Sequence, residues 1–345
     1  MPNDLTTVTE LGTALGTLAY PGVAEALAAR PAALRIDAPT WDRLNGLHGS
    51  GRFAAAFSVA FANGRAFLEA ADGLRGRTPR IIEWTGGRRP PGDEVAPIDL
   101  RIDHVYLVSC KYRSENISSP SPARLFEGLL ATSGSWERGD WYESTAPEAY
   151  QALYEACRRA SGLPMLPGRA TELNTEDRRA LREALPGRRY PDSARAEYRE
   201  LCRVVSERSA ERWRDRLVAA DRERMLWRLL RIGNAPYFLL GVNGIDRMTL
   251  RVGTPWDWRQ AYGLRSLTVG AATTGQPQVN WEATVLDRSS RTEQPVQGHV
   301  EIRWSHGKFS QPPEAKVYVD TPPDRVPGYH PLRPDGPGQG RLWPC

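Results

Sequence analysis

The segment PIDLRIDHVYLVSCKY, residues 97–112, contains two short apolar runs separated by a polar stretch. Along HVYLVSCKY the side chains alternate with a period of two, which is typical of a β-strand. Ser109 and Lys111 are therefore expected on one face of that strand and Cys110 on the other. The segment predicts two antiparallel strands joined by a tight turn.

The turn fixes which residues of the two strands face each other. If residues 102–104 form a three-residue turn, Asp99 pairs with Leu107 across the hairpin. Asp99, Leu107, Ser109 and Lys111 then share one face of the sheet, because alternate residues point the same way. A carboxylate and an ammonium group would converge on one place.

Lysine is rare in this chain, which makes Lys111 notable. The three lysines are Lys111, Lys308 and Lys316, and every other basic side chain among the 46 Lys and Arg residues is arginine. A carboxylate beside a lysine suits phosphodiester hydrolysis. The carboxylate helps to hold Mg²⁺, which lowers the pKa of a bound water, and the lysine orients or activates that water. Lysine suits this role better than arginine because its pKa falls when it is partly buried.

These residues resemble the PD-(D/E)XK nuclease superfamily, which includes most type II restriction endonucleases. PID, ending at Asp99, is similar to the first half of the family motif. SCK, from Ser109 to Lys111, is similar to the second half, with serine in place of the family's carboxylate. The resemblance covers residues 50–130. It implies an α/β (α+β) fold with a restriction-endonuclease-like mixed sheet flanked by helices, Mg²⁺ as cofactor, and DNA cleavage in restriction or defence against foreign DNA. It also implies a homodimer.

A second carboxylate is needed, because the hydroxyl of Ser109 is a poor Mg²⁺ ligand. Glu69, Glu83 and Glu115 are the candidates, and Glu69 is favoured because family members often place an acidic residue in the helix before the first strand. The resemblance also implies that the carbonyl of Cys110 binds the metal. The predicted catalytic residues are Asp99, Lys111, Ser109 and Glu69, and the predicted metal ligands are Asp99, Glu69 and Cys110.

Other readings of the same residues stay open. Asp99 and Lys111 could form an ordinary cross-strand ion pair, and Glu69 could pair with Arg65 one helical turn away. A non-catalytic nucleic-acid-binding protein with a decayed nuclease fold is one alternative function. A small-molecule hydrolase acting through Cys110 is another, and RNA could replace DNA as the substrate.

Two stretches carry the predicted nucleic-acid contacts. A mildly basic chain suits a polyanionic partner, and the formal net charge is +5 with a pI of about 9.1. The polar stretch KYRSENISSPSPARLF and the Arg/aromatic mixture HVEIRWSHGKF contain side chains that contact phosphates and base edges in other proteins. The predicted contacts are Arg113, Asn116, Ser118, Arg124, Arg303, His306 and Lys308. A solvated loop and buried tryptophans are the alternative readings.

The pattern along all 345 residues divides the chain into five segments. These are an N-terminal helical segment (1–50), a nuclease-like core (51–165), a helical region (166–232), a β-rich nucleic-acid-positioning module (233–320) and a Pro/Gly-rich tail (321–345). The four cysteines form no C-x-x-C pair, which argues against a structural zinc site. Neither a secretory signal nor a membrane-spanning apolar run is recognisable, so we expect a cytoplasmic protein without membrane contact. The phosphate-binding and hydrolase motifs G-x-x-x-x-G-K-[ST], G-x-G-x-x-G, H-E-x-x-H and G-x-S-x-G are absent.

Overall fold

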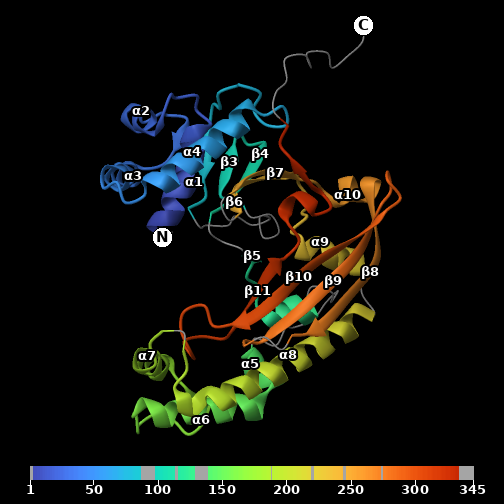
Figure 1. Cartoon of the computed structure of the whole chain (residues 1–345). Coiled ribbons are helices and arrows are strands. Elements are labelled where there is room, and N and C mark those ends of the chain that lie inside the picture. Colours follow the sequence, from blue (N-terminus) through green and yellow to red (C-terminus); the bar gives the residue numbers. More distant parts are fainter. Residues whose placement is uncertain are drawn as a thin grey trace. The chain divides into compact units, whose positions relative to one another are not determined.

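The computed structural model describes residues 3–86, 98–112, 116–128, 139–187, 189–218, 221–243, 246–272 and 275–333. The chain folds into two compact units. The first, here the seven-stranded unit, combines residues 1–115, 231–261 and 322–345, and the second, the five-stranded unit, combines residues 116–230 and 262–321. Each unit is thus built from separate stretches of the chain, as the colours of Figure 1 show.

The seven-stranded unit begins with helices. They are α1 (Asp4–Gly16), α2 (Val23–Ala29), α3 (Ala38–Gly49) and α4 (Ala54–Glu69), and α10 (Pro255–Ala261) and the short η4 (Pro323–Arg325) come later in the chain. The side chain of Asn3 accepts a hydrogen bond from Thr6 N at the start of α1, and Asp37 caps α3 in the same way. Helices α1, α2 and α3 all lie within residues 1–50, so this stretch is helical as predicted.

Two glycines let α1 and α4 pack closely. A Cβ atom on Gly64 would lie 2.1 Å from the carbonyl oxygen of Thr13, and one on Gly16 would lie 2.1 Å from that of Phe61. No side chain fits in either place, so the backbones of the two helices touch at this crossing. The close approach fixes α1 against α4 and the sheet below them.

The sheet of this unit is mixed. Its order is β1-β2-β3-β4-β6-β7-β12. The strands are β1 (Leu34–Arg35), β2 (Ile82–Trp84), β3 (Leu100–Ile102), β4 (Tyr106–Lys111), β6 (Tyr237–Asn243), β7 (Asp246–Val252) and β12 (Tyr329–Pro331). The β1–β2 and β4–β6 pairs are parallel and the other pairs are antiparallel. The predicted mixed α/β class is therefore confirmed.

The core of the unit lies between the sheet and the helices α1 and α4 (Figure 1). Leu11 and Leu15 of α1 and Phe67 of α4 are fully buried in one cluster with Leu100 of β3 and Val108 of β4. Burying such side chains stabilises the fold by about 2 kcal/mol each. The apolar face of the predicted hairpin is thus the face that the helices cover.

The β3–β4 hairpin has a different register from the predicted one. Arg101 faces Leu107, not Val105, so the strands are offset by two residues and the turn spans 103–105. Asp103 and His104 both adopt positive φ, at 50° and 61°. The carboxylate of Asp103 also accepts hydrogen bonds from the backbone N–H groups of residues 80 and 81, which anchors the turn at this place. An offset of two residues leaves every side chain on its expected face.

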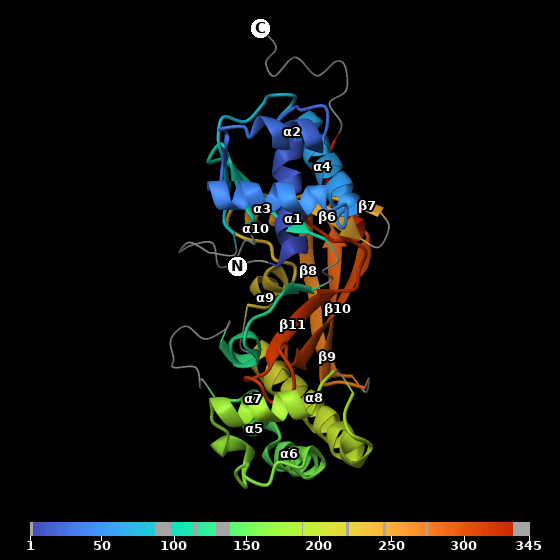
Figure 2. The same ribbon diagram turned by 90° about the vertical axis from the view of Figure 1, so that its left-hand side faces the viewer.

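The five-stranded unit consists of an antiparallel sheet and a set of helices. The sheet order is β5-β11-β10-β9-β8, with β5 (Asn116–Ser118), β8 (Tyr262–Ala271), β9 (Gln278–Asp287), β10 (Glu293–Arg303) and β11 (Glu314–Val319). The helices are the π-helix η1 (Arg124–Gly128), α5 (Trp141–Thr145), α6 (Pro147–Ser161), η2 (Ala170–Glu172), α7 (Thr175–Ala184), η3 (Asp192–Ala194), α8 (Arg195–Val218) and α9 (Arg222–Leu229). Helix α8 lies along β8 and β9, where Ser206 accepts a hydrogen bond from Gln278 N at 2.9 Å (Figure 2).

This division replaces the five consecutive segments expected from sequence. The 1–50 segment is not separate, because α1 packs on α4 and on the sheet. Strands β6 and β7, expected in the 233–320 module, belong to the sheet of the hairpin. The 321–345 tail contributes β12, and its part from 334 onward lies outside the described residues. Within the described ranges, no helix is long and apolar enough to cross a membrane.

Candidate active site

Asp99 and Ser109 meet where β3 and β4 lie side by side. The Asp99 carboxylate accepts a hydrogen bond from the Cys110 amide at 2.6 Å and a longer one from the Ser109 hydroxyl at 3.4 Å. Ser109 is fully buried. Two donors, the Cys110 amide and the Ser109 hydroxyl, therefore fix the orientation of the Asp99 carboxylate.

Asp99 is a half-buried carboxyl group with basic side chains nearby. Burial raises its pKa above the ordinary value, while the Cys110 amide, Lys111, Ser109 and Arg231 each lower it. Lys111 thus acts on Asp99 from the next strand, as expected from sequence. Arg231, which is itself 6% exposed, adds a positive charge that the sequence did not point to.

The second carboxylate of this cluster is Glu10, in α1. Only 7% of Glu10 is exposed, and its Oε2 accepts a hydrogen bond of 2.6 Å from the indole N–H of Trp84 in β2. Burial and the neighbouring charge of Asp99 raise the pKa of Glu10 to about 8, although Trp84 and Lys111 lower it. Glu10, Asp99 and Lys111 therefore form one electrostatic cluster, with two acidic groups that repel each other when both are ionised.

Sequence reasoning missed Glu10, although a signal was present. Glu10 is the one charged residue between Asp4 and Glu25, and the other residues from Leu5 to Gly16 are apolar, small or hydroxylated. Residues 7–16 of this helix are all buried. A lone carboxylate on a buried helix is costly unless it has a role or a partner.

Of the carboxylates proposed from sequence, Glu69 and Glu83 do not fill this place. The side chain of Glu69 is 66% exposed and lies 3.9 Å from Arg65, so the alternative of a helical ion pair is the one observed. Glu83 lies 3.3 Å from the Nδ1 atom of His104. Glu115 lies outside the described residues. Glu69 sits in the last turn of α4, where its side chain faces solvent, and Glu10 is the carboxylate whose charge interacts with that of Asp99.

Buried hydrogen bonds hold the end of β4 against both helices. The hydroxyl of Tyr112, next to Lys111, lies 3.0 Å from the Thr13 hydroxyl and accepts from the Asn63 amide at 2.9 Å. Asn63 also donates to the carbonyl of Gly241 in β6 at 2.8 Å. The helix that carries Glu10 and the strand that carries Lys111 are thus joined through Tyr112.

The thiol of Cys110 is poorly suited to nucleophilic attack. Burial, Asp99 and Glu10 raise its pKa well above the ordinary value. The reactive form of a cysteine is the thiolate. Cys110 therefore stays protonated near neutral pH, which argues against a hydrolase acting through this residue.

Glu10 and Asp99 fit a hard divalent cation. Mg²⁺ takes oxygen ligands, keeps several waters and needs only one or two carboxylates. Burial and the charge of Asp99 keep the pKa of Glu10 high, and a bound cation would offset the repulsion between the two carboxylates. The carbonyl of Cys110 as a further ligand stays a prediction. No group of three or more His, Cys, Asp or Glu side chains that could hold a metal is found in the part of the chain that the structure describes.

Lys308, predicted as a nucleic-acid contact, is buried and forms its hydrogen bonds within the five-stranded unit. It is 5% exposed, and its ammonium donates to the carbonyls of Leu185 at 3.2 Å and Gly187 at 2.9 Å. It also lies over the ring of Tyr190 at 5.0 Å. Burial lowers the pKa of Lys308. The side chain ties a loop to the fold and is not available to a ligand.

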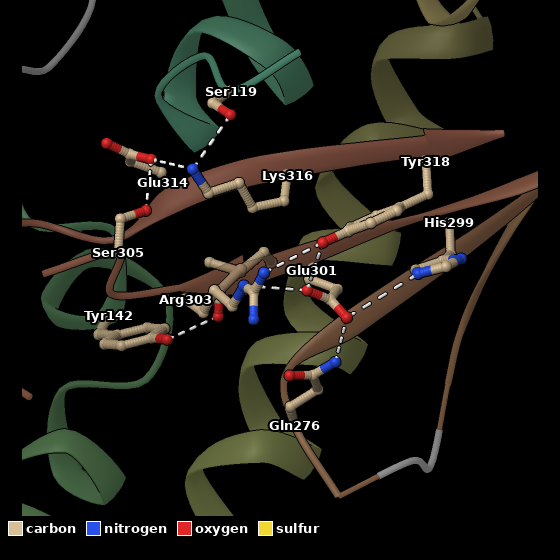
Figure 3. A network of polar contacts seen from close by, with 11 residues as sticks. Ser119, Tyr142, Gln276, His299, Glu301, Arg303, Ser305, Glu314, Lys316 and Tyr318 are labelled. Carbon is tan, nitrogen blue, oxygen red and sulfur yellow. Dashed lines mark hydrogen bonds and ion pairs between the residues drawn. The ribbon is translucent and has the colours of Figure 1, made fainter. Parts of the chain in front are cut away.

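Arg303 is held by its own sheet (Figure 3). Its guanidinium lies 3.0 Å from Glu301 and donates to the Tyr318 hydroxyl at 3.1 Å. Glu301 is shared further with Gln276 and His299. The positive charge of Arg303 is balanced by Glu301 within this network, so its guanidinium is not free to bind phosphate.

The other predicted contacts have mixed outcomes. His306 is exposed and Ser118 pairs with Val317 in the five-stranded sheet. Arg124 is exposed in η1. Arg113 and the side chain of Asn116 lie outside the described residues.

Comparison of the chain with protein-family models, with curated proteins and with solved structures finds no match in any of the three.

Proposed function

We propose that the chain is a Mg²⁺-dependent endonuclease that hydrolyses DNA phosphodiester bonds, in restriction or in defence against foreign DNA. The observation that carries the proposal is the electrostatic cluster of buried Glu10 with half-buried Asp99 and Lys111. Glu10 comes from helix α1, Asp99 directly precedes β3, and Lys111 ends the neighbouring strand β4 of a mixed sheet. An acidic residue in a helix before the first strand of the hairpin is what the PD-(D/E)XK resemblance implies, and Glu10 occupies such a place.

Each residue of the cluster has a separate role in the proposed reaction. Glu10 and Asp99 would hold Mg²⁺, which when bound polarises the phosphoryl oxygen and acidifies a water. Glu10, with a pKa of about 8, is largely protonated at neutral pH in the absence of metal, so its proton must leave when a cation is bound. Lys111 would orient the attacking water and counter the charge that develops on the phosphate. Ser109 keeps Asp99 in position.

A plasmid-nicking assay tests the proposal. We expect cleavage with Mg²⁺, no cleavage with EDTA, and loss of on the order of 100-fold or more in rate for Lys111→Ala, Asp99→Asn and Glu10→Gln. Glu69→Gln is the matched control and should cleave normally. Discrete fragments indicate site-specific cutting and a smear indicates non-specific degradation. Full activity in Glu10→Gln would contradict the assignment of the second carboxylate.

One observation favours a second candidate, a non-catalytic nucleic-acid-binding protein with a decayed nuclease fold. Ser109 stands where the family motif has a carboxylate, and its hydroxyl faces Asp99. In that case the wild type binds DNA but cleaves neither DNA nor RNA with Mg²⁺ or Mn²⁺, and Lys111→Ala leaves the affinity unchanged. Parallel digests of DNA and RNA also decide between the two substrates.

A homodimer is part of the nuclease proposal, because a duplex has two strands to cut. Sedimentation velocity with and without a DNA duplex measures it directly. A monomer in both states would leave single-strand nicking as the expected activity.

A further inference from the structure

Most arginines of α8 are neutralised inside the five-stranded unit. Ion pairs join Arg195 to Asp192 at 2.6 Å, Arg203 to Glu200 at 2.6 Å and to Glu207 at 2.7 Å, Arg208 to Glu211 at 2.9 Å, and Arg212 to Glu127 at 3.3 Å. The long basic helix is therefore a salt-bridged surface, and it offers few uncompensated charges to a ligand.

Three other arginines of this unit form a cluster of like charge. Arg224 and Arg228 are one turn apart on α9, and Arg124 lies in η1. The charges of Arg224 and Arg124 both act on the Arg228 guanidinium. Within the described ranges, no carboxylate lies at ion-pair distance from any of the three, in contrast to the arginines of α8.

The cluster is costly without an anion. Arg228 is half-buried, and burial together with the charges of Arg224 and Arg124 lowers its pKa. A guanidinium nevertheless stays protonated in proteins, so proton loss does not relieve the repulsion. Bound negative charge does.

We propose that Arg124, Arg224 and Arg228 bind phosphate groups of a nucleic-acid backbone, as a second contact carried by the five-stranded unit and separate from the catalytic cluster. Guanidinium groups bind phosphate oxygens through paired N–H donors, and backbone contacts of this kind position a nucleic acid without reading its sequence. A polyanion offers several phosphates to the three guanidiniums, which lie on two different elements, whereas a lone phosphate offers one. The inference rests on the proposed function only in taking nucleic acid as the ligand.

Fluorescence anisotropy of a labelled DNA duplex in EDTA, over a series of KCl concentrations, tests the proposal without cleavage. For Arg224→Ala/Arg228→Ala we expect affinity to fall on the order of tenfold or more, about equally for unrelated duplex sequences. The slope of log K against log [salt] should become shallower by about two. Arg124→Ala should reduce the slope by about one. Arg228→Lys, which keeps the charge, should retain the slope.

Arg203→Ala/Arg208→Ala is the matched control, since it removes the same formal charge from the same unit. An equal loss of affinity in this control would show a general charge effect and overturn the proposal. So would an unchanged salt slope in the α9 variant. Competition with inorganic phosphate separates the two sources of the ligand. Displacement of the duplex by millimolar phosphate, at constant ionic strength, would assign the cluster to a free anion and overturn the nucleic-acid assignment.

Folding of the variants is checked by thermal melting. The double α9 variant removes like-charge repulsion, so it should melt no lower than the wild type in the absence of ligand. The outcome is also distinguishable from that of the nuclease proposal. Wild-type binding that depends on this cluster, in a protein that never cleaves, upholds the phosphate contact and overturns the nuclease. If the wild type cleaves DNA and the arginine variants bind DNA as tightly as the wild type, the nuclease proposal is upheld and the phosphate contact is overturned.

Discussion

Replacing Glu10 by glutamine should remove a large part of the pH dependence of unfolding of the seven-stranded unit. The pKa of Glu10 rises from 4.5 to about 8 on folding, so between these values the folded state holds a proton that the unfolded state releases. The stabilisation from that proton is fully present below pH 4.5 and is lost as the pH rises through about 8. A glutamine at this position does not titrate.

The size of the effect follows from the same two values. A pKa shift from 4.5 to about 8 corresponds at most to a free energy on the order of 5 kcal/mol. Between pH 6 and 8.5 the proton linkage then decreases the free energy of unfolding by about 2.5 kcal/mol in the wild type and not in Glu10→Gln. Repulsion from Asp99 contributes to this shift, so Asp99→Asn should reduce the pH dependence in part.

Urea unfolding in EDTA at several pH values between 6 and 8.5 measures the effect, with Glu69→Gln as the control because Glu69 is an exposed carboxylate in the same unit. The quantity of interest is the free energy of unfolding of the wild type minus that of the variant. If this difference stays constant within about 0.5 kcal/mol across the range, Glu10 is not the buried titrating group described above, and the case for a cation site loses its main support.

Three further outcomes are expected. Adding Mg²⁺ at pH 8 should raise the melting temperature of the wild type but not that of Glu10→Gln, and an equal rise in both would place the cation elsewhere. In urea titrations, Gly64→Ala should lower the free energy of unfolding by about 3 kcal/mol, because its Cβ would lie 2.1 Å from a backbone oxygen of α1. The control Gly46→Ala, whose Cβ would meet nothing within 4 Å, should change this free energy by less than about 1 kcal/mol. Lys308→Met should cost about 1–3 kcal/mol, since two carbonyls lose their donor, and should leave DNA affinity by anisotropy unchanged.

The hairpin was predictable because its information is local. Alternation along residues 105–111 predicts which face of the sheet each side chain occupies, and a register error of two residues does not change that face. The register itself was not predictable from a residue count, since it depends on the anchoring of Asp103 by the backbone of residues 80 and 81. A contact between a turn and a distant segment leaves no periodic signal in the sequence.

The second carboxylate was misplaced for a similar reason. Glu69 and Glu10 both lie in helices that precede the hairpin, and only packing decides which helix presents its acid to Asp99. The glycines at positions 16 and 64 bring α1 into direct contact with α4. A conserved role cannot be read from one sequence, but an isolated charge in a helix of small and apolar residues, as at Glu10, was visible and pointed to a special environment.

The order of the strands has a consequence for synthesis of the chain. Strand β4, which carries Lys111, lies between β3 and β6, and β6 begins only at Tyr237, after the first stretch of the other unit has been translated. A nascent chain shorter than this leaves the Lys111 strand as an open edge and lacks the Asn63–Gly241 hydrogen bond. The sheet that carries Lys111 is therefore completed late, after most of the polypeptide has been translated.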